Sequence, residues 1–193
     1  DLFRNHEFLI QKLLGLLPAQ EGTPLGESLQ LKLALAYVLT YRFTEAQEVL
    51  KKLDHSQDLT TRQKAKFYRG WIFKLNAQYD EGAEVLLDLL EEPKLEPELG
   101  LGLIAEVADI YYQKKEPIKA LGYYKRLSQE AGVESDTLSR RAAVAAWMAL
   151  GELEQANINL FDLDDPVAAD ANFDRLGELF PNSQYFGELK RAF

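Results

Sequence analysis

The chain has 193 residues, a formal net charge of −9 and no cysteine. The negative charge argues against nucleic acid as a ligand, since phosphate binding needs a basic surface, and the lack of cysteine excludes disulfides, thiolate nucleophiles and thiolate metal sites. Apolar residues make up 47% of the chain, yet no run approaches the roughly 20 residues that cross a bilayer, so we expect a packed core and no transmembrane segment.

The first predicted element is a helix within residues 1–17, where apolar residues recur at helical spacing. Charged residues interrupt this pattern and no methionine precedes it, a layout unlike that of a signal peptide. We therefore expect a trimmed or mature fragment, whose targeting segment was removed or never existed. Residues 18–26 contain two prolines and two glycines, and because this composition breaks helices they predict the longest loop.

The rest of the chain predicts four helical hairpins followed by capping helices. The hairpins are expected at residues 27–55, 60–92, 98–131 and 136–163, and the capping helices at 166–193, so that residues 1–193 form a single array. Thr60 or Thr61 is the expected N-cap of the second hairpin, Gly132 the stop of the third, and Gly151 the turn residue of the fourth.

A small residue recurs at one position in the second helix of every hairpin, at intervals of 36, 38 and 36 residues: Ala46, Gly82, Ala120 and Ala156. Twelve residues earlier stand Ala34, Gly70, Ala108 and Val144, and three residues after these stand Tyr37, Phe73, Tyr111 and Trp147. Small side chains let two helices approach closely, and the rings fill the space between hairpins. A fixed period of this length predicts a stacked repeat array.

These positions resemble the tetratricopeptide repeat over residues 27–163. The resemblance implies an all-α fold, a right-handed superhelical array of antiparallel helical hairpins. The chain departs from the family in its period of 36 to 38 residues, against about 34 in the family, and in Val144. A second, shorter resemblance lies in residues 180–186, which are similar to the Pro-x-Ser-x-Tyr phrase of bacterial envelope tetratricopeptide lipoproteins. It favours an envelope location, although the compartment stays open.

The resemblance implies a non-catalytic scaffold that binds a protein or peptide in a concave groove, with an amphipathic helix or extended peptide as the guest. The expected groove residues are Leu35, Leu39, Phe67, Trp71, Lys74, Asp109, Tyr112 and Met148. Two alternatives remain. The N-terminal helix could itself bury the apolar stretch from Leu31 to Leu39, or the chain could be a docking domain of a larger assembly that uses its convex face or its ends.

No catalytic or metal-binding pattern occurs. His6 and His55 lack a nearby acid or nucleophile at motif spacing, and phosphate loops, dinucleotide glycine patterns and serine elbows are absent. The acidic residues between 162 and 174 lack the glycine and closing glutamate of a calcium loop, so they predict an N-cap and a solvated turn around Pro166. We expect no enzyme activity, no cofactor and no metal.

Overall fold

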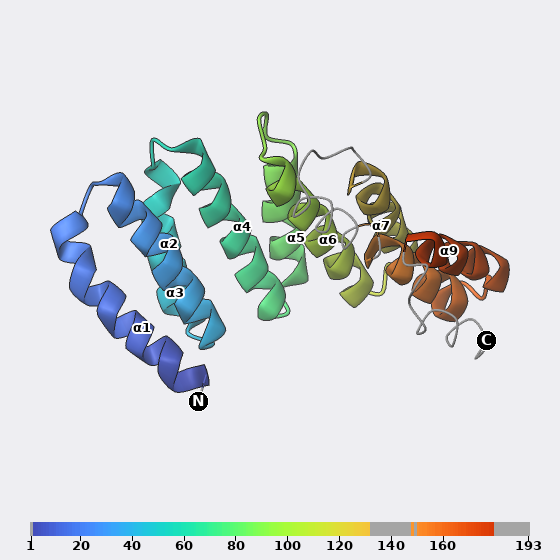
Figure 1. Cartoon of the computed structure of the whole chain (residues 1–193), viewed down its shortest axis with the longest axis horizontal. Coiled ribbons are helices and arrows are strands. Elements are labelled where there is room, and N and C mark those ends of the chain that lie inside the picture. Colours follow the sequence, from blue (N-terminus) through green and yellow to red (C-terminus); the bar gives the residue numbers. More distant parts are fainter. Residues whose placement is uncertain (1, 132–147, 149, 180–193) are drawn as a thin grey trace. The chain divides into compact units, whose positions relative to one another are not determined.

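The computed structural model describes residues 2–131, 148 and 150–179, and within these ranges it contains helices and turns but no strand (Figure 1). The chain divides into two compact units, residues 1–99 and 100–193. The predicted all-α fold of antiparallel hairpins is confirmed. Within the described residues, no helix is both long enough and apolar enough to cross a membrane.

Unit 1 contains α1, two helical hairpins and two short 3-10 helices. Its elements are α1 (Leu2–Leu16), η1 (Leu17–Gln20), α2 (Pro24–Leu39), α3 (Phe43–Lys52), η2 (Leu53–His55), α4 (Leu59–Leu75) and α5 (Tyr79–Leu90). Helices α2 and α3 pack as one hairpin, and α4 and α5 as the next. Ala34 and Ala46 are fully buried between the helices of the first hairpin, as the close-approach argument predicts.

Two expectations for the helix starts in unit 1 are wrong. The loop over residues 18–26 is shorter than predicted, because η1 occupies its start and α2 begins at Pro24, whose missing N–H costs nothing in a first turn. Helix α4 is capped by Asp58 instead of Thr60 or Thr61. The Asp58 carboxylate accepts hydrogen bonds from the Thr61 hydroxyl at 2.7 Å and the Thr61 backbone N–H at 2.8 Å, and these bonds lower the pKa of Asp58.

The turns inside the first three hairpins share one design. The backbone N–H of Arg42 donates to the carbonyl of Tyr37 at 2.9 Å, and the N–H of Tyr41 donates to that of Val38 at 3.0 Å. These two bonds, with Tyr41 at a φ of 60°, form a Schellman motif. Ala77 and Lys115 occupy the equivalent places in the next two hairpins, with φ of 58° and 61°.

Helix α1 matches the second helix of a hairpin, although the sequence pattern did not identify it as one. Leu17 begins η1 directly after α1, and Leu53, 36 residues later, begins η2 directly after α3. Ile10 of α1 and Ala46 of α3 are also 36 residues apart, and both are fully buried. Helix α1 packs on α2 as α3 packs on α4. Leu39 nevertheless remains 47% exposed, so α1 does not fully cover the predicted apolar stretch.

Unit 2 contains most of α6 (Pro97–Gln113), α7 (Pro117–Ala131), a helix over residues 150–157, a turn of π-helix labelled η3 (Ile158–Asp162), and α9 (Pro166–Leu179). Gly151 is helical instead of forming a turn. A Cβ on it would lie 2.8 Å from the carbonyl oxygen of Tyr124, so its missing side chain permits a close helix contact. Gly132, Val144, Trp147 and the part of the expected capping helices beyond residue 179 lie outside the described residues.

Candidate functional site

Helices α2 and α4 present one partly exposed apolar surface, which we name the apolar row. It consists of Leu31, Leu35 and Leu39 on α2 and, each 36 residues later, Phe67, Trp71 and Leu75 on α4. The spacing of four residues keeps each set on one helix face, and the two helices are in contact. Leu39 and Leu75 are 47% and 44% exposed, and the other four side chains are half-buried.

The expected groove residues fall into two sets, one in each unit. Leu35, Leu39, Phe67, Trp71 and Lys74 belong to unit 1, where all but Lys74 are members of the apolar row. Asp109, Tyr112 and Met148 belong to unit 2, and all three are half-buried there. Asp109 and Tyr112 stand 38 residues after Trp71 and Lys74, so they occupy equivalent repeat positions.

The groove residues of unit 2 are one acid, one tyrosine and one methionine, so this set is more polar than the set in unit 1. The nearby Asp162 carboxylate raises the pKa of the Tyr112 hydroxyl, with smaller contributions from burial and from Glu154. Burial raises the pKa of Glu154, and the charge of Asp109 adds to this effect. The apolar character of the predicted wall is therefore concentrated in unit 1.

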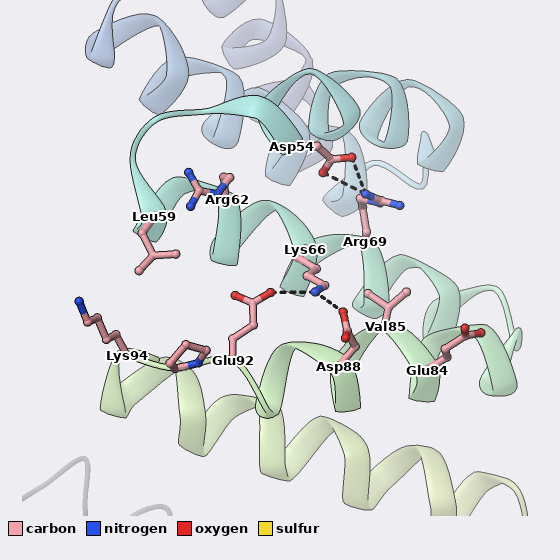
Figure 2. A pocket seen from close by; sticks show the side chains of 11 residues that line it. Asp54, Leu59, Arg62, Lys66, Arg69, Glu84, Val85, Asp88, Glu92 and Lys94 are labelled. Atoms are coloured by element: carbon pink, nitrogen blue, oxygen red, sulfur yellow. Dashed lines mark hydrogen bonds and ion pairs between the residues drawn. The ribbon is translucent and has the colours of Figure 1, made fainter.

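The sequence did not predict a second feature of unit 1, a pocket of about 830 Å³ that we name the charged pocket (Figure 2). Its lining comes from η2, α4, α5 and the residues after α5: Asp54, Leu59, Arg62, Lys66, Arg69, Glu84, Val85, Asp88, Glu92, Pro93 and Lys94. Arg69 bonds both carboxylate oxygens of Asp54, at 2.9 and 2.7 Å. Lys66 bridges Asp88 and Glu92, the latter at 2.8 Å.

These ion pairs fix the middle of the charged pocket. Burial lowers the pKa of Lys66, but its hydrogen bonds to Asp88 and Glu92 outweigh burial and hold the pKa above its ordinary value. The ammonium group therefore stays charged. Asp54 precedes α4, while Asp88 and Glu92 belong to α5 or follow it, so the pairs also tie α4 to both neighbouring elements.

A smaller pocket of about 350 Å³ lies between α1, α2 and α3, and we name it the apolar pocket. Its lining is Leu14, Leu17, Pro18, Glu21, Gly26, Gln30, Leu33, Tyr37, Val49 and Lys52. Six of these ten residues match a residue of the charged pocket at an interval of 36, for example Gln30 with Lys66 and Leu33 with Arg69. In four of the six pairs a charged side chain replaces a neutral one.

The predicted turn near Pro166 is confirmed in part. The Asp165 carboxylate accepts a hydrogen bond from the backbone N–H of Ala168 at 3.0 Å, which is the geometry of an N-cap on α9. Within the described residues, no group of three acidic or histidine side chains has an arrangement that could hold a metal ion.

Comparison with known proteins supports the fold. No protein-family model matches the sequence, and no curated protein does either. Among solved structures, the crystal structure of a single-residue variant of a Podosopora anserina protein is similar, with a TM-score of 0.65. That protein is assigned as a kinesin light chain and has nearly identical TPR-like repeats. The match has 16% sequence identity and covers 90% of this chain and 84% of that chain. The chain thus has a TPR-like fold, as its repeat positions indicate.

Proposed function

We propose that this protein is a non-catalytic interaction scaffold that binds a partner peptide or amphipathic helix on the apolar row. TPR-like arrays expose long surfaces built from equivalent positions of successive repeats, and such surfaces are suited to binding other proteins. The observation that carries the proposal is the repetition of the row. Three partly exposed apolar side chains on α2 recur at the same register on α4.

The row has the chemistry of a protein interface. Contiguous exposed apolar side chains mark binding surfaces on soluble proteins, and aromatic residues contribute most to interface energy. Trp71 and Phe67 are half-buried, and Trp71 packs against the hydrophobic core, so part of each side chain remains accessible to a partner. Two adjacent helices with such rows match the apolar stripe of an amphipathic helix, whose side chains recur at similar intervals.

A polar position beside the row would define the register of the partner. Lys74 follows Trp71 on α4. A polar rim adds little affinity but selects between partners. We therefore propose that the partner carries charged residues beside its apolar stripe.

The test introduces charge into the row without disturbing the core. Leu39 and Leu75 are each close to half exposed, so the double substitution Leu39→Glu/Leu75→Glu should leave helicity unchanged in circular dichroism. Pull-down from an extract of the source organism, followed by affinity measurement with the purified partner, should show at least tenfold weaker binding. Ile118→Glu is the control, because Ile118 is 73% exposed and lies outside the row.

The rival function is a docking domain that uses other faces of the array. The two pockets on the opposite side of α2 and α4 favour it, because they offer a separate contact surface. If the row variant and the wild-type protein capture the same partner with equal affinity, the proposed groove function is wrong and this rival is preferred.

A further inference from the structure

The apolar pocket and the charged pocket occupy the same step of two successive repeats. Val49 and Lys52 line the first, and Val85 and Asp88, each 36 residues later, line the second. On α4 the pocket residues Arg62, Lys66 and Arg69 point roughly 170° away from the apolar row, at 100° per residue. The two pockets thus form a surface distinct from the one assigned to the proposed function.

One end of the charged pocket holds two cations that form no direct ion pair with an acidic side chain of the described residues. In Figure 2, Leu59, Arg62 and Lys94 lie toward one end of the pocket, and Val85 and Glu84 toward the other. Among the described residues, no carboxylate lies within ion-pair distance of Arg62 or Lys94. One guanidinium N–H of Arg62 donates to the carbonyl of Ser56, which leaves its other donors available. The nearby Asp58 carboxylate is hydrogen-bonded to Thr61 and interacts with Arg62 only through its charge, without a direct ion pair.

The middle of the charged pocket cannot provide this positive site, because its cations are already paired. Lys66 is shared between two carboxylates and Arg69 is paired with Asp54. A partner carboxylate would meet repulsion from Asp88 and Glu92 there. At the end formed by Arg62 and Lys94 it would instead gain charge-assisted hydrogen bonds, which are roughly twice as strong as neutral ones. Charge complementarity therefore selects an acidic group and one location for it.

The apolar pocket selects a different side chain. Leu33 and Tyr37 are almost fully buried at its base, Leu17 and Val49 are half-buried, and Leu14 is 41% exposed. A pocket of about 350 Å³ is within the size range of small-ligand sites, and half of its lining residues are aliphatic. It suits one branched or aromatic side chain, such as leucine or phenylalanine.

The distance between the pockets sets the spacing of these two side chains. Equivalent lining positions of the two pockets lie on α2 and α4, which are in contact, and the axes of packed helices lie about 8–10 Å apart. A polyproline II segment rises about 3.1 Å per residue and returns a side chain to the same side every third residue. An apolar residue and an acidic residue three or four positions apart in an extended peptide would therefore span the two pockets.

We propose that this side of unit 1 binds an extended segment of a partner protein, with an apolar side chain in the apolar pocket. A carboxylate three or four residues away binds at Arg62 and Lys94. The contact is independent of the apolar row, so one chain can hold two partners or two segments of one partner. Two such contacts on one scaffold raise the overall affinity through effective concentration.

The test selects peptides that bind the full chain. Phage-displayed random dodecapeptides are panned on wild-type protein after removal of those that bind the variant Arg62→Glu/Lys94→Glu. We expect enriched sequences with an apolar residue and an acidic residue three or four positions apart. Synthetic versions should bind at least tenfold more weakly to that variant, to Lys94→Glu alone and to Leu14→Glu.

Controls separate this surface from the apolar row and from a general charge effect. Lys32→Glu/Lys125→Glu makes the same change in net charge at exposed positions outside both pockets and should bind the peptides as the wild-type protein does. Leu39→Glu/Leu75→Glu should also bind them normally. The inference is overturned if no peptide is enriched, if the enriched peptides lack an acidic residue, or if the row variant abolishes their binding. The last result would still support the proposed function.

Discussion

Gly70 of α4 and Leu86 of α5 meet between the two helices of the second hairpin. A Cβ on Gly70 would lie only 2.6 Å from Cγ of Leu86, which is fully buried. Carbon atoms at such a distance overlap strongly, because the optimal separation is about 3.5–4.0 Å. The absence of a side chain at residue 70 thus sets the separation of the two helices.

Gly70→Ala should destabilise the protein. Overpacking of a filled core costs about 1–3 kcal/mol, and the better helix propensity of alanine returns at most about 1 kcal/mol, so we expect a net loss of about 1–2 kcal/mol. Urea unfolding followed by circular dichroism measures it. Gly122→Ala in α7 is the matched control, because nothing lies within 4 Å of its added Cβ; it should stabilise by up to about 1 kcal/mol. Equal effects at both sites would contradict the close-contact explanation.

The repeated small residues were the most predictive part of the sequence. Alanine or glycine at residues 34, 46 and 70 is buried as the packing argument requires, because steric exclusion depends only on side-chain size and helix spacing. The N-terminal helix was harder to classify. Ile10 stands where later repeats have a small residue, and this large side chain hides the relation of α1 to α3.

The pockets could not be predicted from residue types alone. Arg69 pairs with Asp54 across 15 positions and Lys66 with Asp88 across 22, and these distances match no local helical spacing. Which charges are neutralised and which remain available depends on three-dimensional packing. The apolar row was predictable because spacings of four residues indicate one helix face, but its binding role remains a prediction.

Ala77→Gly should stabilise the protein, because Ala77 adopts a left-handed conformation with φ of 58° at the turn between α4 and α5. That conformation costs a residue with a Cβ about 1–2 kcal/mol. Glycine removes this cost, but it also makes the unfolded chain more flexible, which offsets part of the gain. We expect a gain of about 0.5 kcal/mol in the free energy of unfolding. Ala83→Gly, the same change inside α5, should destabilise. A loss of stability at residue 77 would show that the turn does not strain alanine.

Asn172→Asp should destabilise unit 2 in a pH-dependent way. The Asn172 amide donates to the Glu152 carboxylate at 2.6 Å and accepts from Asn159 at 3.0 Å, and all three residues are buried. A carboxylate at residue 172 would lose that donor and face Glu152, so we expect a loss of about 2–3 kcal/mol at pH 7.

The pH dependence distinguishes charge repulsion from simple misfit. Two facing carboxylates raise each other's pKa, so the folded protein binds more protons than the unfolded chain. The penalty should therefore grow as the pH rises above about 4 and shrink below it. Urea unfolding at pH 4 and pH 7 measures this. The control is Ala171→Asp on the exposed side of α9, where we expect a change within about 0.5 kcal/mol at both pH values. A penalty independent of pH would point to misfit.

Glu154→Gln should raise the melting temperature at neutral pH. Burial and the charge of Asp109 raise the pKa of Glu154, so the ionised carboxylate is less favourable in the folded protein than in the unfolded chain. The folded state then holds extra protons at acidic pH, and stability falls as the pH rises from the ordinary glutamate value of about 4.3 through the raised value. Glutamine removes this loss and can still accept the hydrogen bond from Asn157.

For Glu154→Gln we expect an increase of up to about 3 °C in the melting temperature at pH 7 and little change at pH 4. The control is Glu178→Gln, because Glu178 is exposed on α9. An equal increase in melting temperature there would mean that the lower net negative charge, and not local burial, is the cause.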